Sequence, residues 1–418
     1  MLQQPGFFDQ GTLVSVMTLA PLDSALDYRA PEGGCHMGAY VEVPLGPRKV
    51  LGVVWGAGRG DYDLSKIRAV ARVLNVAPMR AELQSFLERG ADYTLTPRPA
   101  MLRLATRVPG LSNPPSMRKV YRPGATEPDR MTDARRRVLE TFQSYGGLAF
   151  TLKELADMAG VSQSVIKGMV ALGAVQEEDT PRDLPFQTLE TAHSQTILTA
   201  AQNSAANALI AGLKEQTYGT TLLKGVTGSG KTEVYLEAVA ECLRQGRQAL
   251  VLLPEIALTA EFLNRVEARF GALPAEWHSG VTLTERRRVW KMVGSGGAQM
   301  VIGARSALFL PYQNLGLIVV DEEHDSSYKQ EDGVLYNARD MAVLRASICG
   351  ARVVLASATP SLESWANAEA GKYQYLELAA RFGVAVMPKL GAIDMRGETL
   401  QAGRWISHTL QKAMEHRL

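Results

Sequence analysis

The sequence of 418 residues lacks long apolar runs. Those it has are short and broken by Gly, Pro or charged residues, so none approaches the roughly 20 residues that cross a bilayer. The first residues also lack the charged, apolar and small-residue succession of a signal peptide. With 46% hydrophobic residues, the chain has enough apolar material for buried cores. These observations predict a globular cytoplasmic protein without a membrane partner.

Cysteine is scarce. The three cysteines, Cys35, Cys242 and Cys349, lie far apart in the sequence and form no C-x-x-C pair. This spacing indicates neither a disulfide framework nor a zinc site. We expect three small buried hydrophobic side chains in a reducing compartment.

The chain also has little excess of one charge sign over the other, since the formal net charge is only +2. The overall balance therefore does not indicate nucleic acid. Basic residues do gather between Arg98 and Arg137, with few acids among them. Such a stretch could neutralise phosphates or could form a solvated linker surface, and both interpretations stay open.

The first hundred residues alternate apolar runs with turn residues. Strands are expected at Leu13–Leu19, Ala39–Pro44 and Val50–Trp55, because each run is bounded by Pro or Gly. This pattern predicts a small β-rich domain over residues 1–105.

Residues 106–192 are expected to hold a linker and a winged-helix domain. Pro109–Pro128 is proline-rich and is typical of a linker. Helical patterns at Leu152–Ala159 and Gln163–Leu172 flank a short glycine turn in the helix-turn-helix layout, with Ser162 as the expected cap of the second helix. Ala174–Phe186 would be a wing or a connection. This layout serves DNA binding or protein docking, and no base-reading residue can be assigned.

From Thr199 onward, short apolar strands alternate with helical patterns, which predicts an α/β fold with a parallel sheet and helices on both faces. We assign this lobe to residues 193–390 and regard 391–418 as the start of a following region. The expected strands are Leu222–Leu223, Ala249–Leu253, Met300–Ile302, Leu317–Val320 and Arg352–Ala356.

A phosphate-binding loop follows the first of these strands. Its glycines let backbone N–H groups curl around an anion, while Lys231 reaches the terminal phosphates and the Thr232 hydroxyl ligates Mg²⁺. The strand before it and the helix after it argue against a chance glycine-rich turn. The candidate nucleotide-binding residues here are Gly225, Thr227, Gly228, Ser229, Gly230, Lys231 and Thr232.

Paired carboxylates follow the apolar run that ends at Val320. A strand ending in acids downstream of a phosphate loop provides what nucleotide hydrolysis needs. We expect Asp321 to hold Mg²⁺ and Glu322 to orient and deprotonate the attacking water. Together with Lys231, they form the candidate catalytic set.

The next residues are candidates for sensing the nucleotide. Glu323 and His324 are expected to contact the γ-phosphate side and the following motif, which is Ser357-Ala358-Thr359 at another strand end. The hydroxyls of Ser357 and Thr359 can hydrogen-bond the acidic segment. We predict that they couple nucleotide state to the rest of the molecule.

In this order the three motifs resemble motifs I, II and III of superfamily 2 helicases. Longer strings closely resemble the primosomal protein N′ (PriA) family of replication-restart DNA helicases. The strings are Gly225–Leu236, Pro254–Thr259, Ile302–Phe309 and Asp321–Gln330.

The resemblance implies a RecA-like P-loop lobe preceded by a β-rich domain that binds DNA 3′ ends and by a winged helix. It implies an ATP-dependent 3′-to-5′ DNA helicase of the replication restart primosome, using ATP and Mg²⁺ in the nucleoid-associated cytoplasm. The implied partners are forked or single-stranded DNA with a 3′ end, primosome proteins and single-stranded DNA-binding protein.

The resemblance also assigns a pocket for the 3′ end of DNA. Asp27 would accept a hydrogen bond from the terminal 3′-OH, and Tyr28 would stack on the last base. Gly46 matches the family's pocket glycine, and Arg68 stands where a lysine is familiar. Leu26 occupies a position where an aromatic residue is familiar.

Two further assignments concern adenine and the DNA backbone. Gln202 fits the upstream glutamine that contacts adenine in these helicases, and the segments Pro254–Thr259 and Gly303–Ser306 resemble those that hold the DNA backbone. Arg305 is the candidate phosphate contact, with a structural arginine as the alternative.

The segment Ser326–Arg339 resembles the family's aromatic-rich loop, which couples single-stranded DNA to hydrolysis. Val334 stands where tryptophan is familiar, so fewer rings are available to stack on bases. The candidate DNA-binding residues of this loop are Tyr328, Lys329 and Tyr336.

Other family features are missing from these 418 residues. No second strand and helix series follows Ser357, and the family's zinc-binding cysteines are absent, so zinc is expected only in a complete family protein. We therefore expect a partial chain that binds nucleotide with little hydrolysis. Two function classes stay open, a partial helicase and a non-catalytic fork-binding scaffold. A restriction-type translocase subunit would share motifs I to III but would not explain the N-terminal domain.

Overall fold

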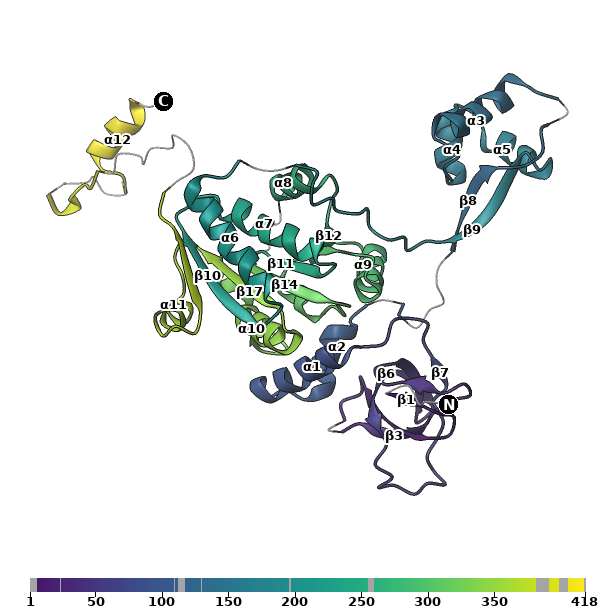
Figure 1. Ribbon diagram of the computed structural model, residues 1–418, viewed down its shortest axis with the longest axis horizontal. Helices are drawn as coiled ribbons and strands as arrows, with labels where there is room; N and C mark the ends of the chain where they lie inside the picture. The colour runs from purple at the N-terminus through teal and green to yellow at the C-terminus, as the bar shows by residue number, and fades with distance from the viewer. Residues whose placement is uncertain are drawn as a thin grey trace.

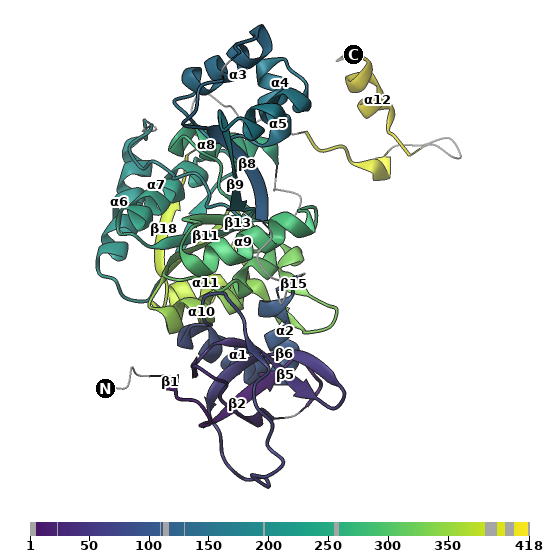
Figure 2. The ribbon, with the colours of Figure 1, turned by 90° about the vertical axis from the view of Figure 1, so that its right-hand side faces the viewer.

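The computed structural model describes residues 6–22, 24–108, 110–111, 117–128, 130–194, 197–254, 259–380, 391–397 and 405–416 (Figure 1). Four of the residues in the Pro254–Thr259 segment, 255–258, lie outside this set, as do 109 and 112–116 of the expected linker. Figure 2 places a β-rich domain and a small helical domain at opposite ends of a central α/β lobe.

The N-terminal domain is built on a five-stranded sheet in the order β3-β2-β6-β5-β7, in which all the neighbouring strands pair antiparallel. Alternate residues such as Val14, Val16, Val41 and Val43 are fully buried in its core. The domain's strands are β1 (Phe7–Phe8), β2 (Leu13–Thr18), β3 (Leu26–Arg29), β4 (Cys35–His36), β5 (Tyr40–Leu45), β6 (Arg48–Ala57) and β7 (Arg72–Val73).

Two helices follow that the sequence analysis did not anticipate, α1 (Ala81–Thr94) and α2 (Arg98–Thr106). Helix α1 buries Leu83, Phe86 and Leu87, which lie on one face because residues three and four apart are neighbours on a helix. Phe86 packs on Phe309 of the α/β lobe, with 5.5 Å between ring centroids. A single apolar cluster thus runs from the N-terminal domain through these helices into the lobe.

The small helical domain contains α3 (Asp133–Ser144), α4 (Leu152–Ala159) and α5 (Gln163–Ala171). A capping box starts α4, in which the Thr151 and Glu154 side chains each accept a hydrogen bond from the other residue's backbone N–H. The helix-turn-helix pair lies where it was predicted. Ser162 occupies the N-cap position of α5 as expected, although its hydroxyl hydrogen-bonds the Ser164 hydroxyl and no backbone N–H.

The expected linker at Pro109–Pro128 contains a strand, β8 (Met117–Pro123), which pairs antiparallel with β9 (Val175–Pro181). Tyr121 is buried in an apolar cluster with residues of all three helices, so its burial outweighs the proline-rich composition. The wing is therefore a two-stranded ribbon that closes the winged helix.

The lobe has a seven-stranded sheet in the order β12-β13-β11-β14-β17-β10-β18, with all the neighbouring strands parallel. The five expected strands are present, and the edge strands β12 and β18 are additions. Their bounds are β10 (Gly219–Gly225), β11 (Gln248–Leu252), β12 (Ala275–Trp277), β13 (Met300–Gly303), β14 (Leu315–Asp321), β17 (Arg352–Ser357) and β18 (Gln374–Leu378).

Helices cover both faces of this sheet. Successive strand residues point to opposite sides, so Leu222 and Leu223 of β10 enter different apolar clusters. Helices α6, α7 and α8 pack on one face, and α9 and α10 pack on the other. The helices of the lobe are α6 (Ala200–Lys214), α7 (Lys231–Arg244), α8 (Ala260–Phe270), α9 (Leu283–Ser295), α10 (Ala338–Cys349) and α11 (Leu362–Glu369).

The remaining elements are short. They are η2 (Arg305–Phe309), η3 (Ser326–Tyr328), β15 (Lys329–Gln330), β16 (Tyr336–Asn337), η4 (Met395–Gly397) and α12 (His408–Glu415). Within the described residues, no helix is long and apolar enough to span a membrane. The three cysteines are free thiols, with Cys35 and Cys242 buried and Cys349 half-buried.

Candidate functional site

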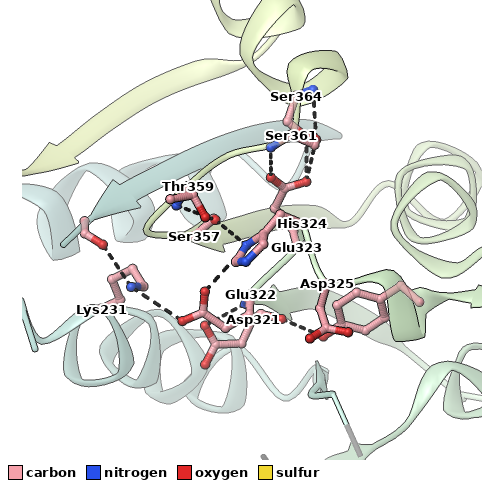
Figure 3. Close-up of polar contacts among 12 residues, drawn as sticks. Lys231, Asp321, Glu322, Glu323, His324, Asp325, Ser357, Thr359, Ser361 and Ser364 are labelled. Atoms are coloured by element: carbon pink, nitrogen blue, oxygen red, sulfur yellow. Dashed lines mark hydrogen bonds and ion pairs between the residues drawn. The ribbon is translucent and has the colours of Figure 1, made fainter. Parts of the chain in front are cut away.

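Three neighbouring strands of the lobe end at the predicted motifs. Strand β17 lies between β14 and β10, pairing Asp321 with Ala356 and Lys224 with Ser357. Parallel strands present their carboxyl ends at the same edge of a sheet. The phosphate loop, the acidic segment and the Ser-Ala-Thr motif therefore meet at one place, as Figure 3 shows.

The phosphate loop has the backbone that its glycines permit. Gly228 and Gly230 have φ of +79° and +82°, a left-handed conformation that favours glycine. A Cβ on Gly225 would lie 2.5 Å from the Ser229 hydroxyl oxygen. The loop enters α7 directly at Lys231, so the free N–H groups of the first helical turn face the loop.

The polar groups of the loop form an incomplete network. The Lys231 ammonium donates to the Gly225 carbonyl at 2.9 Å and lies 3.7 Å from Glu322 Oε1. The Ser229 hydroxyl is buried and has no hydrogen-bond partner among the described residues. A buried hydroxyl without a partner is unfavourable, and an acceptor such as a phosphate oxygen would satisfy it.

Gln202 lies behind this loop. Its amide oxygen accepts from the Thr199 backbone N–H at 2.9 Å, and its Nε2 donates to the Ser229 carbonyl at 2.9 Å. Both polar ends of a buried side chain are thus engaged within the protein. Gln202 therefore contacts the phosphate loop directly, and the adenine contact implied by the resemblance stays a prediction.

Asp321 stands half-buried at the end of β14. Burial, with a smaller contribution from the Glu322 carboxylate, raises the pKa of Asp321 to about 6. Its Oδ2 accepts a 2.9 Å hydrogen bond from the hydroxyl of Tyr235, and its Oδ1 accepts from the Glu322 backbone N–H at 3.0 Å. Both carboxylate oxygens are therefore held in place.

Glu322 has an unusual backbone for a residue with a side chain, with φ of +44°. Such a conformation costs of order 1 kcal/mol or more and persists only where the surroundings impose it. It turns the side chain toward Lys231 and brings Oε2 within 3.7 Å of His324 Nδ1 (Figure 3). The strain is consistent with a side chain aimed at the phosphate loop.

His324 joins the acidic segment to the Ser-Ala-Thr motif. Its Nδ1 is 2.8 Å from the Ser357 hydroxyl, which also accepts from the Thr359 backbone N–H at 3.0 Å. The chain of contacts from Glu322 through His324 to Ser357 crosses from β14 to β17. Thr359 takes part in these contacts through its backbone N–H.

Glu323 points away from the phosphate loop. Its side chain is fully buried and accepts hydrogen bonds from the Ser361 backbone, the Ser361 hydroxyl and the Ser364 hydroxyl at 2.7 to 2.9 Å. The Arg339 guanidinium lies 3.5 Å from it. The Glu323 side chain therefore does not face the γ-phosphate side as expected. It does contact the segment after Ser357.

The expected DNA-coupling rings also lie inside the protein. Tyr328 is 1% exposed, and its hydroxyl lies 2.6 Å from the Asp321 carbonyl and 3.0 Å from the Leu252 carbonyl. Tyr336 is also buried and packs on Phe309. Because neither ring is presented at the surface, this arrangement differs from the exposed stacking rings that the sequence analysis expected.

Arg305 lies beside that segment. Its guanidinium donates to the Ser327 carbonyl at 2.8 Å and the Lys329 carbonyl at 3.0 Å, which flank Tyr328. The side chain remains partly exposed, and Lys329 itself is exposed and 3.4 Å from Glu331. Arg305 thus has a structural role, the alternative given above, and can still reach a ligand at the surface.

The N-terminal candidates come together in a cavity of about 380 Å³. Arg68 donates to the Gly46 carbonyl at 3.1 Å, Tyr28 donates to the Pro44 carbonyl at 3.1 Å, and Asp27 accepts from the Gly60 N–H at 2.7 Å. Four further side chains bring charge or aromatic surface to its wall, namely Arg59, Asp61, Tyr62 and Lys66. Tyr28 lines the cavity but is only 4% exposed, so little of its ring is available to a base.

Comparisons with known proteins match the N-terminal domain and the α/β lobe to two different family profiles. A family profile described as "3′ DNA-binding domain (3′BD)" of PriA matches residues 15–107. A profile for DEAD/DEAH box helicases matches residues 199–368. The first contains the N-terminal cavity, and the second contains the strand ends of Figure 3.

Curated relatives match over most of the chain. The replication restart protein PriA of Haemophilus influenzae is 34% identical over 97% of this chain and 57% of its own length. That of Bacillus subtilis is 31% identical over 92% of this chain and 57% of its own length. The chain belongs to the PriA family. It spans just over half of the length of these relatives.

A shorter match is stronger. The PriA protein of Rickettsia conorii is 50% identical over 198 residues, which is 47% of this chain and 31% of that protein. Among solved structures, the helicase domain of Pyrococcus furiosus Hef is 17% identical over 42% of this chain and 37% of its own, with a TM-score of 0.32. The helicase MrfA is 20% identical over 44% and 30%, also with a TM-score of 0.32.

Sequence reasoning missed several residues of this PriA-family site. Tyr235 contacts Asp321, Arg339 pairs with Glu323, and Ser361 and Ser364 cap that buried acid. The helical spacing of Thr232 and Tyr235 was the available signal, since residues three apart share a face. Within the described part of the chain, no group of three or more His, Cys, Asp or Glu residues could hold a metal ion.

Proposed function

We propose that this chain supplies the ATP-binding lobe and the DNA 3′-end recognition of an ATP-dependent 3′-to-5′ helicase that restarts replication at stalled or forked DNA. The observation that carries this proposal is the meeting of Lys231, Asp321, Glu322 and Ser357 at the ends of three adjoining strands. The PriA-type 3′ DNA-binding match over residues 15–107 supports the DNA part.

The residues of the phosphate loop fit ATP. The loop presents a glycine backbone, an ammonium and a buried hydroxyl without a partner, all of which suit phosphate oxygens. Lys231 would exchange the Gly225 carbonyl and Glu322 for the terminal phosphates. Gln202 would hold the loop in shape from behind through the Ser229 carbonyl.

The donor set also fits Mg²⁺, because Thr232 and Asp321 offer the hydroxyl and carboxylate oxygens that this hard cation prefers. When bound with nucleotide, it neutralises charge on the transferred phosphoryl group. Glu322 would orient the attacking water and take its proton. His324 and Ser357 would carry a change at Glu322 across to β17.

The N-terminal cavity supports recognition of a DNA end. Asp27 would accept the terminal 3′-OH, while Arg68, Arg59 and Lys66 would lie near the last phosphates. The edge of Tyr28 would contact the last base. The Gly46 carbonyl would continue to accept the hydrogen bond from Arg68. The space beside Gly46 would stay open to the DNA, since a Cβ there has no neighbour within 4 Å.

The domain assignment is part of this proposal. Residues 1–105 would bind the 3′ end, 106–192 would form a linker and winged helix, 193–390 would form the ATP-binding lobe, and 391–418 would begin a following region. The winged helix would contact DNA or a protein of the primosome. Single-stranded DNA-binding protein is a further proposed partner, and the proposed location is the nucleoid-associated cytoplasm.

The proposal is tested by nucleotide binding and ATP hydrolysis in the 418-residue polypeptide, with and without a fork bearing a 3′-OH end. We expect Mg²⁺-dependent ATP binding that Lys231→Ala removes, with little hydrolysis from this polypeptide alone. Absence of nucleotide binding would contradict the assignment of the phosphate loop. Fork-stimulated hydrolysis would contradict the expected low activity and would strengthen the helicase assignment.

A second candidate is a fork-binding scaffold that binds ATP and DNA without unwinding. The burial of Tyr328 and Tyr336 favours it, because buried rings offer no platform on which DNA could act upon the ATP site. Fork-stimulated hydrolysis would exclude this candidate. A scaffold would bind the fork and show no change in hydrolysis rate.

A further inference from the structure

A buried tyrosine contacts the acidic strand end from the helix that follows the phosphate loop. Tyr235 lies on α7 and is 0% exposed. Its hydroxyl donates to Asp321 Oδ2 at 2.9 Å. Because α7 begins at Lys231, the tyrosine joins the helix of the phosphate loop to the acidic strand end.

The direction of this hydrogen bond follows from the number of protons. A phenol has one hydrogen, which Tyr235 gives to the Asp321 carboxylate.

We propose that Tyr235 is a positioning residue that fixes the Asp321 carboxylate in the orientation that takes Mg²⁺ with nucleotide. This inference rests on the proposed function. The Glu322 backbone N–H holds Oδ1 of the carboxylate at 3.0 Å, so Tyr235 supplies the second of two restraints. Without the phenol hydrogen, the carboxylate could rotate.

The test is Tyr235→Phe, which removes one oxygen from a buried ring. Binding of a fluorescent ADP to the 418-residue chain is measured during a Mg²⁺ titration and again in EDTA. We expect the Mg²⁺ concentration for half-maximal binding to rise about 10-fold or more, as suits one lost hydrogen bond to a charged group. Affinity in EDTA should not change.

Tyr121→Phe is the matched control, because Tyr121 is also buried and donates to a carboxylate, Glu177, far from the site. An unchanged Mg²⁺ requirement in Tyr235→Phe would overturn the inference while leaving the nucleotide site intact. Equal losses with Mg²⁺ and with EDTA would indicate a general packing role and would also overturn it. Failure of the unaltered chain to bind nucleotide would overturn the proposed function as well.

Discussion

The two candidate sites of this chain are built in different ways. The nucleotide site gathers residues from the ends of three adjoining parallel strands, and its acids are buried or braced from several sides. The N-terminal cavity is bounded by strands β3 and β5 and by the loop after β6, and its charged groups are largely exposed. The first site is determined by sheet topology, whereas the second depends on loop contacts such as that of Arg68 with Gly46.

This difference predicts that the two sites can be disabled separately. Lys231→Ala removes the ammonium that enters the phosphate loop and should weaken nucleotide binding roughly 100-fold, as suits the loss of charge-assisted hydrogen bonds. Binding of DNA with a free 3′ end should be unchanged. Fluorescence titration with a nucleotide analogue and with a fork measures both in the same preparation. A parallel loss of DNA binding would show that the sites are not separable.

Asp321→Asn tests the acid of the nucleotide site whose pKa is raised, with Asp27 of the other site as the comparison. The folded protein binds the Asp321 proton more tightly than the unfolded chain, because its pKa is raised to about 6. Stability without nucleotide therefore falls as pH rises between about 4 and 6. The variant should be more stable than the unaltered chain by about 2 kcal/mol at pH 7, and the gain should vanish near pH 4.

Denaturant unfolding at several pH values checks this expectation. Asp27→Asn is the control in the other site, where we expect less than about 0.5 kcal/mol of change at pH 7. If Asp321→Asn is less stable than the unaltered chain at pH 7, the hydrogen bonds of the carboxylate stabilise the fold by more than the burial of its charge costs.

Asp27→Asn should act on DNA instead. Replacing the carboxylate by an amide weakens the acceptor for a terminal 3′-OH, so the preference for a 3′-OH end over a 3′-phosphate end should fall about 5-fold. Nucleotide binding should be unchanged. Competition between forks that differ only in this end group provides the measurement, and an unaltered preference would remove Asp27 from the recognition set.

Arg68→Lys should have the smallest effect. A lysine keeps the positive charge and can still reach the Gly46 carbonyl, but it loses the planar guanidinium. We expect fork affinity to fall by about 3-fold or less. A loss of 10-fold or more would mean that Arg68 contacts the DNA through two parallel hydrogen bonds.

The sequence predicted the parts of the fold that follow from local pattern. The buried strands of the lobe read as continuous apolar runs, and the phosphate loop is contiguous. Lys231 and Asp321 could therefore be placed at the carboxyl ends of two strands of one parallel sheet in advance. Strand β8 could not, because its pairing with β9 joins segments far apart in sequence, and its proline-rich flank is typical of a linker.

Side-chain direction was the main limit on predicting the sites. Glu323 follows Glu322 in the sequence, yet its side chain points into a buried hydrogen-bond network with Ser361. The positive φ of Glu322 changes the direction of the backbone between the two side chains. The aromatic character of Tyr328 suggested stacking, although its ring is buried against the strand ends. Neither orientation follows from residue type or spacing alone.

The most direct test of the account is fork binding by the unaltered chain and by Lys231→Ala, using forks that end in a 3′-OH or a 3′-phosphate. The account predicts tighter binding of the 3′-OH fork by both proteins, with nucleotide binding lost only in the variant. Equal affinity for the two forks in the unaltered chain would contradict the claim that one polypeptide joins 3′-end recognition to an ATP-binding lobe.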